Sequence, residues 1–245
     1  MKNTRIAMVV SRSAMGNIDE NLKGMENWVK RAKKKDVRLV CFPEMNITGY
    51  STRSDIRDIA ECIPGKATAR VSELARRFGV VILAGMAEKG DNHDIFASHI
   101  VFEPDGRLDV YRKLHIAPPE KSIYSPGDAI PVFQTSGITF GIQLCYDAHF
   151  PELTTRLAEK GAELIFMPHA SPRGTPRIKR TSWMRHLPAR AYDNSIFVAA
   201  ANQTGMNGSG LVFPGLAMVI APSGQLLSEK FCNGEGMLVV GPLRR

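Results

Sequence analysis

The sequence lacks the short motifs that most often bind metals and nucleotides. Its four cysteines, Cys41, Cys62, Cys145 and Cys232, are far apart and form no C-x-x-C pair, so we expect neither a zinc site nor a disulfide framework. The six histidines include no H-E-x-x-H motif, and no G-x-x-x-x-G-K-[ST] phosphate loop occurs. We therefore expect chemistry that requires no metal and no cofactor.

Long apolar runs are missing as well. No run approaches the roughly 20 residues that a membrane-spanning helix needs, so we expect no membrane partner. The N-terminus leads straight into a short strand-like run at 6–10, without the apolar core and cleavage site of a signal peptide. We expect a cytoplasmic protein. With 245 residues, 44% of them hydrophobic, and with no linker or repeat, the chain is expected to form a single domain over 1–245.

The charge is unbalanced, with a formal net charge of +8, which is a feature shared with nucleic-acid-binding proteins. The basic residues are nevertheless spread along the chain. The run at 30–35 closes an amphipathic helix, where cations offset the helix dipole. Basic and aromatic side chains do not interleave. We therefore expect no nucleic-acid partner.

Strand patterns outnumber helix patterns, and βα units are mixed with hairpins. A mixture of this kind predicts sheets with both parallel and antiparallel pairs. It favours an α/β fold in which two mixed β-sheets pack face to face beneath outer helices, as a four-layer α-β-β-α sandwich. The expected strands are 6–10, 37–42, 80–87, 94–102, 107–111, 130–135, 138–144, 163–167, 195–201, 216–221, 225–227 and 237–240. The expected helices are 17–35, 68–78, 151–160 and 176–194.

Cys145 stands at the end of the apolar run 138–144, directly before a polar turn and a helix that starts at Pro151. A side chain at the end of a buried strand is held rigidly and faces a cleft, which is where an α/β enzyme places a nucleophile. Taken alone, a cysteine on an apolar run is more often an inert core thiol. Residues from elsewhere in the chain must decide between these interpretations.

Two other strand ends carry residues that suit a cysteine nucleophile. Glu44 follows the strand at 37–42, and Lys113 follows the strand at 107–111. A carboxylate can take the thiol proton, and an ammonium can stabilise both a thiolate and a developing oxyanion. Each also has an ordinary interpretation, since Glu44 could cap a turn and Lys113 could be a surface lysine. Together at one edge, these residues and Cys145 would form a catalytic site.

The segments around these residues resemble the signature blocks of the nitrilase superfamily of carbon–nitrogen hydrolases. The blocks are Phe-Pro-Glu at 42–44 with Thr-Gly-Tyr at 48–50, Tyr-Arg-Lys-Leu-His at 111–115, and the segment 141–152 around Cys145. The segments 190–194 and 201–205 are similar to later blocks of the family. The resemblance runs from Ile6 to about Val240, with the blocks in family order. On this basis we interpret Cys145 as a nucleophile.

The resemblance implies an α-β-β-α carbon–nitrogen hydrolase domain that forms homodimers or higher homo-oligomers and carries a Glu-Lys-Cys triad. It implies that Glu44 is the general base, that Cys145 attacks the substrate carbonyl, and that Lys113 stabilises the tetrahedral oxyanion. The backbone N–H of Tyr146 would be a second oxyanion donor. Glu120 matches a second glutamate of the family, which is expected to position Lys113 and the substrate. Two carboxylates beside one ammonium would hold that lysine protonated.

The resemblance also narrows the substrate. Cys145 is followed by Tyr-Asp, whereas true nitrilases of the superfamily usually carry Trp-Glu, so nitrile hydrolysis is disfavoured. The pattern is similar to the amidase and N-carbamoyl amidohydrolase branches, which release ammonia through a cysteine thioester. The alternatives are nitrile hydrolysis, acyl transfer to an acceptor other than water, and a non-catalytic scaffold of the same fold. A scaffold has no physical need for Glu44, Lys113 and Cys145 together.

Three further residues are candidates for substrate binding. Arg173 and Arg177 lie in a basic loop between a strand and a helix, where either could bind a substrate carboxylate through a bidentate contact. A surface basic loop explains the same pattern equally well. Asn202 follows the strand at 195–201 and would shape the pocket or hold the strand end. The expected partner is thus a small amide or N-carbamoyl compound.

Overall fold

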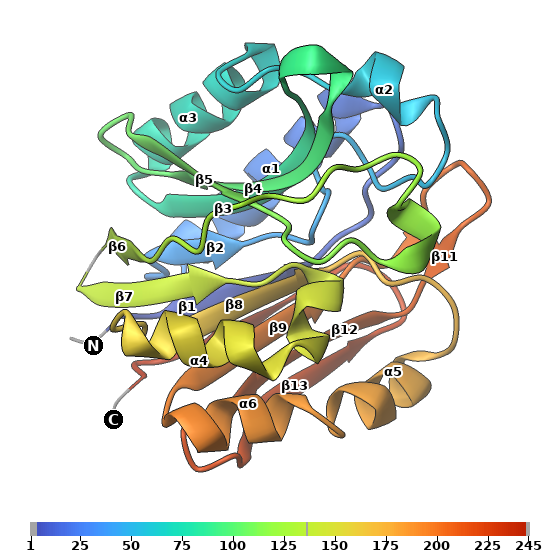
Figure 1. The fold of residues 1–245 in the computed structure, drawn as a ribbon. Coiled ribbons are helices and arrows are strands. Elements are labelled where there is room, and N and C mark those ends of the chain that lie inside the picture. The colour runs from blue at the N-terminus through green and yellow to red at the C-terminus, as the bar shows by residue number, and fades with distance from the viewer. Residues whose placement is uncertain (1–3, 136, 244–245) are drawn as a thin grey trace.

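The computed structural model describes residues 4–135 and 137–243, and its architecture is two sheets packed face to face between layers of helices (Figure 1). One sheet has six strands in the order β14-β1-β2-β3-β4-β5, and the other has six in the order β13-β12-β9-β8-β7-β6. The first contains β1 Ile6–Val10, β2 Leu39–Cys41, β3 Val81–Lys89, β4 Ile95–Phe102, β5 Leu108–Arg112 and β14 Gly236–Val240. The second contains β6 Phe133–Thr135, β7 Ile138–Ile142, β8 Leu164–His169, β9 Phe197–Asn202, β12 Gly215–Ile220 and β13 Leu226–Cys232.

Both sheets are mixed. In the first, β1, β2 and β3 run parallel, while β4, β5 and β14 pair antiparallel to their neighbours. In the second, β7, β8 and β9 run parallel, while β6, β12 and β13 are antiparallel. The carboxyl ends of parallel neighbours meet at one edge of a sheet, so β2 and β7 each deliver the segment that follows them to the end of the sandwich. The predicted α-β-β-α sandwich with two mixed sheets is confirmed.

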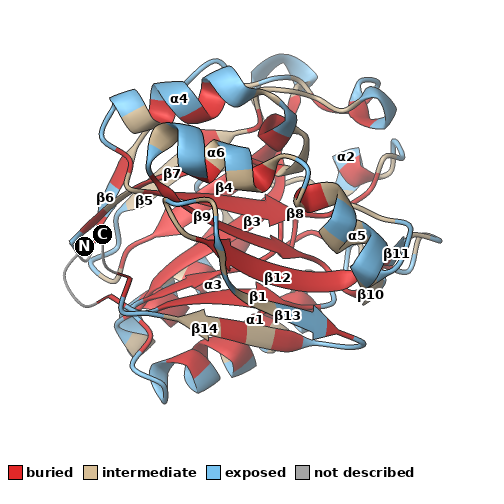
Figure 2. Cartoon of the chain, turned by 90° about the horizontal axis from the view of Figure 1, so that it is seen from below, coloured by how far each residue is buried: buried red, intermediate tan, exposed pale blue. Residues whose placement is uncertain are grey.

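Helices cover the outer faces of the sandwich. The helices are α1 Ile18–Lys33, α2 Ile56–Ile59, α3 Lys66–Phe78, α4 Pro151–Glu159, α5 Pro176–Trp183 and α6 Leu187–Asn194. Helices α1 and α3 pack on the first sheet, and α4 and α6 pack on the second. The inner strands of both sheets are buried along most of their length, whereas the edge strands β5, β13 and β14 are only partly buried and these helices bury one side only (Figure 2). That difference is the one expected for the inner and outer layers of a sandwich.

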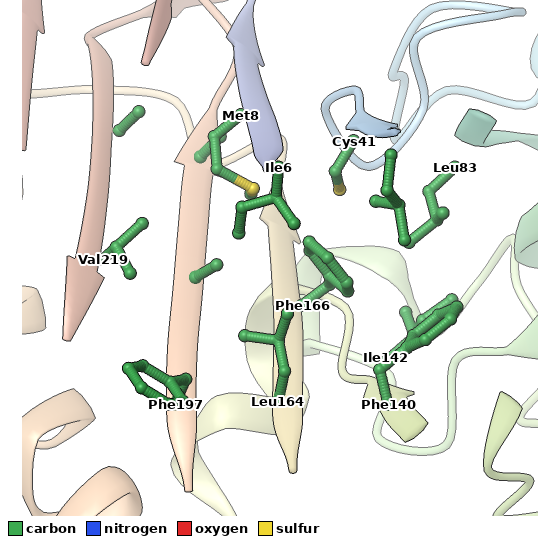
Figure 3. Packing of buried hydrophobic residues seen from close by; sticks show 14 of the residues in the cluster. Ile6, Met8, Cys41, Leu83, Phe140, Ile142, Leu164, Phe166, Phe197 and Val219 are labelled. Atoms are coloured by element: carbon green, nitrogen blue, oxygen red, sulfur yellow. The ribbon is translucent and has the colours of Figure 1, made fainter. Parts of the chain in front are cut away.

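The space between the sheets is filled by apolar side chains from both. Met8 and Leu83 from the first sheet pack in one cluster with Phe140, Phe166 and Val219 from the second (Figure 3). The rings of Phe140 and Phe166 meet edge to face, with centroids 5.3 Å apart, an arrangement favoured by the aromatic quadrupole. Because the strands of both sheets are anchored in this shared cluster, the loops at their ends start from fixed positions.

Several helix boundaries follow local sequence signals. Asn17 caps α1 by accepting a hydrogen bond from the backbone N–H of Glu20 at 3.4 Å. Gly79 ends α3 in the left-handed conformation, with φ of 59°, which glycine adopts without a steric penalty. Pro151 occupies the first turn of α4, where its missing N–H costs no hydrogen bond.

One expected element is wrong. The continuous helix expected at 176–194 is two helices, α5 and α6, which are separated by the turn at Met184–His186. Pro188 stands in the first turn of α6. Proline lacks the N–H that a helix interior needs, and its ring clashes with the carbonyl four residues earlier, so a continuous helix cannot pass through Pro188 without a break.

Smaller differences lie at the ends of strands and in the loops. Strand β2 is shorter than the expected 37–42, and β13 extends to Cys232. The short helix α2 and the hairpin of β10 Gly205–Met206 and β11 Val212–Phe213 were not expected from the sequence. Over residues 4–135 and 137–243, no helix combines the length and the apolar character that crossing a membrane requires.

Candidate active site

The three residues predicted to form a catalytic site come from loops at the ends of both sheets. Glu44 follows β2 and Lys113 follows β5 in the first sheet. Cys145 follows β7 in the second sheet, with two residues between it and the strand. The face-to-face packing of the sheets is therefore what brings the thiol to the side of the carboxylate and the ammonium.

Lys113 is completely buried between two carboxylates. Its Nζ donates to Glu44 Oε1 at 2.7 Å and to Glu120 Oε2 at 2.8 Å, with Glu120 Oε1 at 3.1 Å. Glu120 also accepts from the Tyr50 hydroxyl at 2.9 Å and from the backbone N–H of Ala117 at 3.1 Å. A buried ion cluster persists when its members are satisfied by hydrogen bonds, and here the carboxylates have further partners beyond the lysine.

The second oxygen of Glu44 is also held. Its Oε2 accepts the backbone N–H of Ala170 at 2.8 Å, at the end of β8. The main chain of Glu44 crosses β3 at Gly85, where a Cβ atom would lie 1.6 Å from the carbonyl oxygen of Glu44. Only a residue without a Cβ permits so close an approach. The glycine in β3 thus allows the loop after β2 to lie against the neighbouring strand and fixes the place of Glu44.

Burial and charge set the protonation states in this cluster. Burial alone would lower the pKa of Lys113, but Glu44 and Glu120 outweigh it and hold that pKa well above its ordinary value. The pKa of Glu44 is raised by burial, against the opposing effect of Lys113, and Glu120 raises it further. A carboxyl group with a raised pKa is a better proton acceptor than an ordinary carboxylate.

The Cys145 thiol shares this environment. Burial raises its pKa, Glu44 raises it further, and Lys113 opposes both. The thiol is therefore protonated at neutral pH, and it requires a base before it can act as a nucleophile. Because Glu44 and Lys113 both act on the pKa of this thiol, the thiol lies within electrostatic reach of both.

The backbone at Cys145 adopts a conformation that is uncommon for a side-chain-bearing residue. Its φ is 45°, in the left-handed region, and such backbone strain persists where the surrounding structure enforces it. Cys145 begins a 3₁₀ turn that runs to His149. Tyr146 is the second residue of that turn, so its N–H has no partner within the turn and is available to a substrate oxygen.

The carboxylate of Asp147 fixes this turn through hydrogen bonds. Its Oδ2 accepts the N–H of Leu144 at 2.9 Å and the hydroxyl of Tyr111 at 2.8 Å. Its Oδ1 lies 2.9 Å from both the backbone N and Nδ1 of His115. The ring of His115 stacks on Phe150, with centroids 3.6 Å apart. Buried Asp147 thus ties the loop after β5, which carries Lys113, to the turn that carries Cys145.

A cavity of about 330 Å³ opens above the thiol. Cys145, Tyr146 and Glu120 line it, together with Tyr50 and the rim residue Arg173. The remaining lining residues come from neighbouring loops and from the segment of α5 and the turn after it: Thr52, Ala117, Pro119, His149, His169, Ala170, Ser171, Pro172, Lys179, Ser182, Trp183, His186 and Leu211. A pocket of this size lies at the lower end of the range for small-molecule sites.

Two of the residues predicted to bind substrate lie elsewhere. Arg177 is exposed on α5, outside the residues that line the cavity. Asn202 is completely buried, and it binds backbone: Oδ1 accepts from Ser171 N at 2.9 Å, and Nδ2 donates to Ser171 O at 3.0 Å and to Pro214 O at 2.9 Å. Asn202 thus fixes the loop that carries Arg173, which matches the expectation that it would hold the strand end.

Sequence analysis missed three residues of the site. Tyr50 was noted only as part of a resembling block, and its hydroxyl binds Glu120. Asp147 was read only as a marker of the substrate branch. Lys179 lies on α5 and lines the cavity, but its place in a run of basic residues gave no sign that it pointed inward. Among the described residues, no group of three or more His, Cys, Asp or Glu side chains is arranged to hold a metal ion.

The sequence profile described as carbon-nitrogen hydrolase matches residues 5–241. The chain belongs to the carbon-nitrogen hydrolase family. A nitrilase of Pyrococcus abyssi is 34% identical over 91% of this chain and 84% of its own length. An omega-amidase of Mus musculus is 30% identical over 94% of this chain and 85% of its own. An (R)-stereoselective amidase of a Pseudomonas species is 31% identical over 79% of this chain and 69% of its own.

Similarity to solved structures supports the same family. An amidase of Nesterenkonia from the nitrilase superfamily, with its cysteine replaced by alanine, superposes with a TM-score of 0.87 at 29% identity, over 97% of this chain and 89% of its own. Another variant of that amidase carries the acetamide moiety of fluoroacetamide covalently added at its active-site cysteine. This member of the carbon-nitrogen hydrolase family is an enzyme that hydrolyses amide C–N bonds through a cysteine. The predicted family, fold and reaction class are confirmed.

Proposed function

We propose that Cys145 is the nucleophile of this carbon-nitrogen hydrolase, with Glu44 as its general base. Glu44 takes the thiol proton as Sγ attacks the carbonyl carbon of the amide. The oxyanion that forms accepts hydrogen bonds from Lys113 Nζ and from the backbone N–H of Tyr146. As the tetrahedral intermediate collapses, the C–N bond breaks, the amine leaves with the proton held by Glu44, and a thioester remains on Cys145.

The second half of the reaction restores the enzyme. Water attacks the thioester carbonyl and gives a proton to Glu44, and the same two donors bind the new oxyanion. Collapse expels the sulfur of Cys145, which recovers the proton from Glu44, and the carboxylic acid is released. Glu120 does not exchange protons in this scheme. Together with Glu44 it keeps Lys113 charged and in place.

The observation that carries this proposal is the position of Lys113, buried between Glu44 and Glu120 beside the thiol. A buried ammonium that is neutralised by two carboxylates keeps a donor ready for an oxyanion. The raised pKa of Glu44 suits a group that must accept a proton from a weakly acidic thiol. Neither property is needed for packing alone.

We propose a small amide or N-carbamoyl compound as the substrate, with ammonia among the products. Variants of the Nesterenkonia amidase bind butyramide and acrylamide, and the cavity of about 330 Å³ would admit molecules of that size. Nitrile hydrolysis is the second candidate, because the relative from Pyrococcus abyssi is named a nitrilase. A nitrile would use the same thiol and the same base.

Intact-mass analysis combined with ammonia release tests these roles. The panel contains aliphatic amides, N-carbamoyl amines and the matching nitriles. Wild-type protein should release ammonia from amides or N-carbamoyl amines, and carbon dioxide accompanies ammonia only from the latter. Cys145→Ala should abolish turnover and every adduct. Glu44→Gln should lower kcat/KM by about 10²- to 10⁴-fold, the usual contribution of a general base. Turnover that survives in Cys145→Ala would disprove the assigned nucleophile.

We also propose that the enzyme is a homodimer in the cytoplasm. Large apolar side chains are exposed on α6 and β13, namely Tyr192, Leu227 and Phe231, which is a composition suited to a protein interface. All four cysteines are free thiols, and a reducing compartment preserves a thiol nucleophile. Light scattering coupled to size-exclusion chromatography would reveal a mass near 54 kDa for the dimer, given a chain of 27.0 kDa.

A further inference from the structure

Lys179 is a cation inside the catalytic cavity with no anion beside it. The residue lies on α5, lines the cavity and is partly buried. Its Nζ donates to the Ser171 hydroxyl at 2.6 Å. Of the carboxylates that the structure describes, none lies within ion-pair distance of this ammonium.

The two acidic residues near the cavity already form ion pairs with another lysine. Glu44 and Glu120 both bind Lys113, at 2.7 and 2.8 Å. Lys179 therefore cannot draw on them for charge balance. The adjacent Arg180 on the same helix does have a carboxylate partner, Glu229 at 2.6 Å, on the outside of the cavity. The inward-facing lysine is the one that lacks an anion.

Leaving a partly desolvated charge unpaired is unfavourable, and burial lowers the pKa of Lys179 accordingly. Cys145 acts in the opposite direction on that pKa, which places the ammonium within electrostatic reach of the thiol. An unpaired cation near a nucleophile is the arrangement expected where a charged part of the substrate completes the site. The other lining cation, Arg173, is exposed at the rim and adds to the positive potential of the same wall.

We propose that Lys179 binds a carboxylate of the substrate, so that the preferred substrate is a small amide bearing a negative charge a few atoms from its scissile bond. The proposal rests on the function proposed above and specifies its substrate class. The Ser171 hydroxyl accepts from Lys179, which leaves its own proton free to donate to the same carboxylate. Charge-assisted hydrogen bonds of this kind are about twice as strong as neutral ones.

The carboxylate can belong to either side of the scissile bond. In the monoamide of a dicarboxylic acid it is on the acyl group, which stays on Cys145 as the thioester. In an N-carbamoyl amino acid it is on the amine, which leaves. Either would place an anion at Lys179 while the carbonyl carbon lies at the thiol, so the two sources are distinguished by experiment.

Two substrate pairs isolate the charge. Succinamate and butyramide differ by a carboxylate in place of a methyl group, as do N-carbamoyl-β-alanine and propylurea. Wild-type protein should show the higher kcat/KM for the charged member of at least one pair. Lys179→Met, which keeps the length of the side chain, should lower kcat/KM for that charged member by about 10- to 100-fold, mainly through KM. It should change the neutral member by less than about threefold.

Two further variants separate binding from structure. Lys179→Arg retains the charge and should recover part of the preference. Arg185→Met removes a positive charge from the exposed turn between α5 and α6, outside the cavity, and should leave the preference unchanged. A purely structural role for Lys179 would instead reduce activity on charged and neutral members alike, and that result would overturn the proposal.

A binding measurement keeps the test independent of turnover. Calorimetry with Cys145→Ala and succinamate or N-carbamoyl-β-alanine should give a dissociation constant about 10- to 100-fold lower than that of the Cys145→Ala/Lys179→Met double variant. Equal dissociation constants would overturn the inference, even if amide turnover were normal. Tight, lysine-dependent binding without turnover by wild type would instead leave the carboxylate site standing and contradict the proposed hydrolysis.

Discussion

Lys113 Nζ lies 2.7 Å from Glu44 Oε1, and both side chains are shielded from solvent. The lysine follows β5 and the glutamate follows β2, two strands of one sheet that are not adjacent. A pair of this kind serves two purposes. It satisfies two charges that would be costly to bury singly, and it presents an ammonium to the thiol that approaches from the other sheet.

Lys113→Met should therefore damage both activity and stability. Removing the ammonium eliminates an oxyanion donor, and we expect kcat to fall by at least about 10²- to 10³-fold. It also leaves Glu44 and Glu120 buried without their cation, which should lower the free energy of unfolding by about 3–5 kcal/mol. Ammonia release and urea unfolding measure the two effects. Lys121→Met, at a nearby exposed position, is the matched control, and equal stability of the two variants would contradict the argument.

Gly85→Ala should displace Glu44 without altering any group that we assign to the chemistry. The added Cβ would lie 1.6 Å from the carbonyl oxygen of Glu44 and 2.6 Å from Nδ1 of His99. Neither distance is sterically possible, so the loop after β2 must move. A misplacement of about 1 Å can cost about 10²-fold in rate, and we expect a loss of at least that size in kcat/KM. Gly234→Ala, where a Cβ would meet nothing within 4 Å, should have wild-type kinetics.

Asp147→Asn should loosen the turn that carries Cys145. The carboxylate accepts hydrogen bonds from Leu144, Tyr111 and His115, and an amide offers only one acceptor oxygen in its place. At least one buried donor then loses its partner, at a cost of about 1–3 kcal/mol in the free energy of unfolding. Because Cys145 depends on this turn for its positive φ, kcat should fall by about tenfold or more. Unchanged kcat with reduced stability would show that the turn holds without Asp147.

His99 should make stability depend on pH. Burial lowers its pKa from 6.5 to about 3, so between these values the unfolded chain binds a proton that the folded chain does not. Its contribution to stability is complete above pH 6.5 and is lost as the pH falls, by about 1.4 kcal/mol per pH unit. Between pH 7 and pH 5, wild type should lose about 2 kcal/mol more than His99→Gln in urea unfolding.

The control for this experiment is His93→Gln, at an exposed position, which should keep the pH dependence of the wild type. If wild type and His99→Gln lose the same free energy between pH 7 and pH 5, the buried imidazole does not account for acid sensitivity. Glu44, whose pKa is raised, lies next to His99 and also contributes to the pH dependence of stability. The effect of His99 is therefore the difference between the wild-type and His99→Gln stability curves.

The sequence by itself determined the layers and the reactive residue types. The order of apolar runs and amphipathic segments predicts two mixed sheets with outer helices. Strands and helices can be told apart in the sequence because their side chains repeat with different periods. Three separate blocks placed Glu44, Lys113 and Cys145 at strand ends. The break between α5 and α6 also has a local signal, Pro188. The helical spacing of apolar residues on both sides of Pro188 nevertheless favoured one continuous helix.

Only the tertiary structure decided which charged residues face the thiol. Arg177 and Lys179 are two residues apart on α5, yet the first is exposed and the second lines the cavity. Asn202 appeared able to shape a pocket, but it binds the backbone of Ser171 and Pro214 instead. The direction of such side chains depends on how α5 packs against the second sheet. That packing brings together residues that are far apart in the chain, so the local pattern of apolar residues does not predict it.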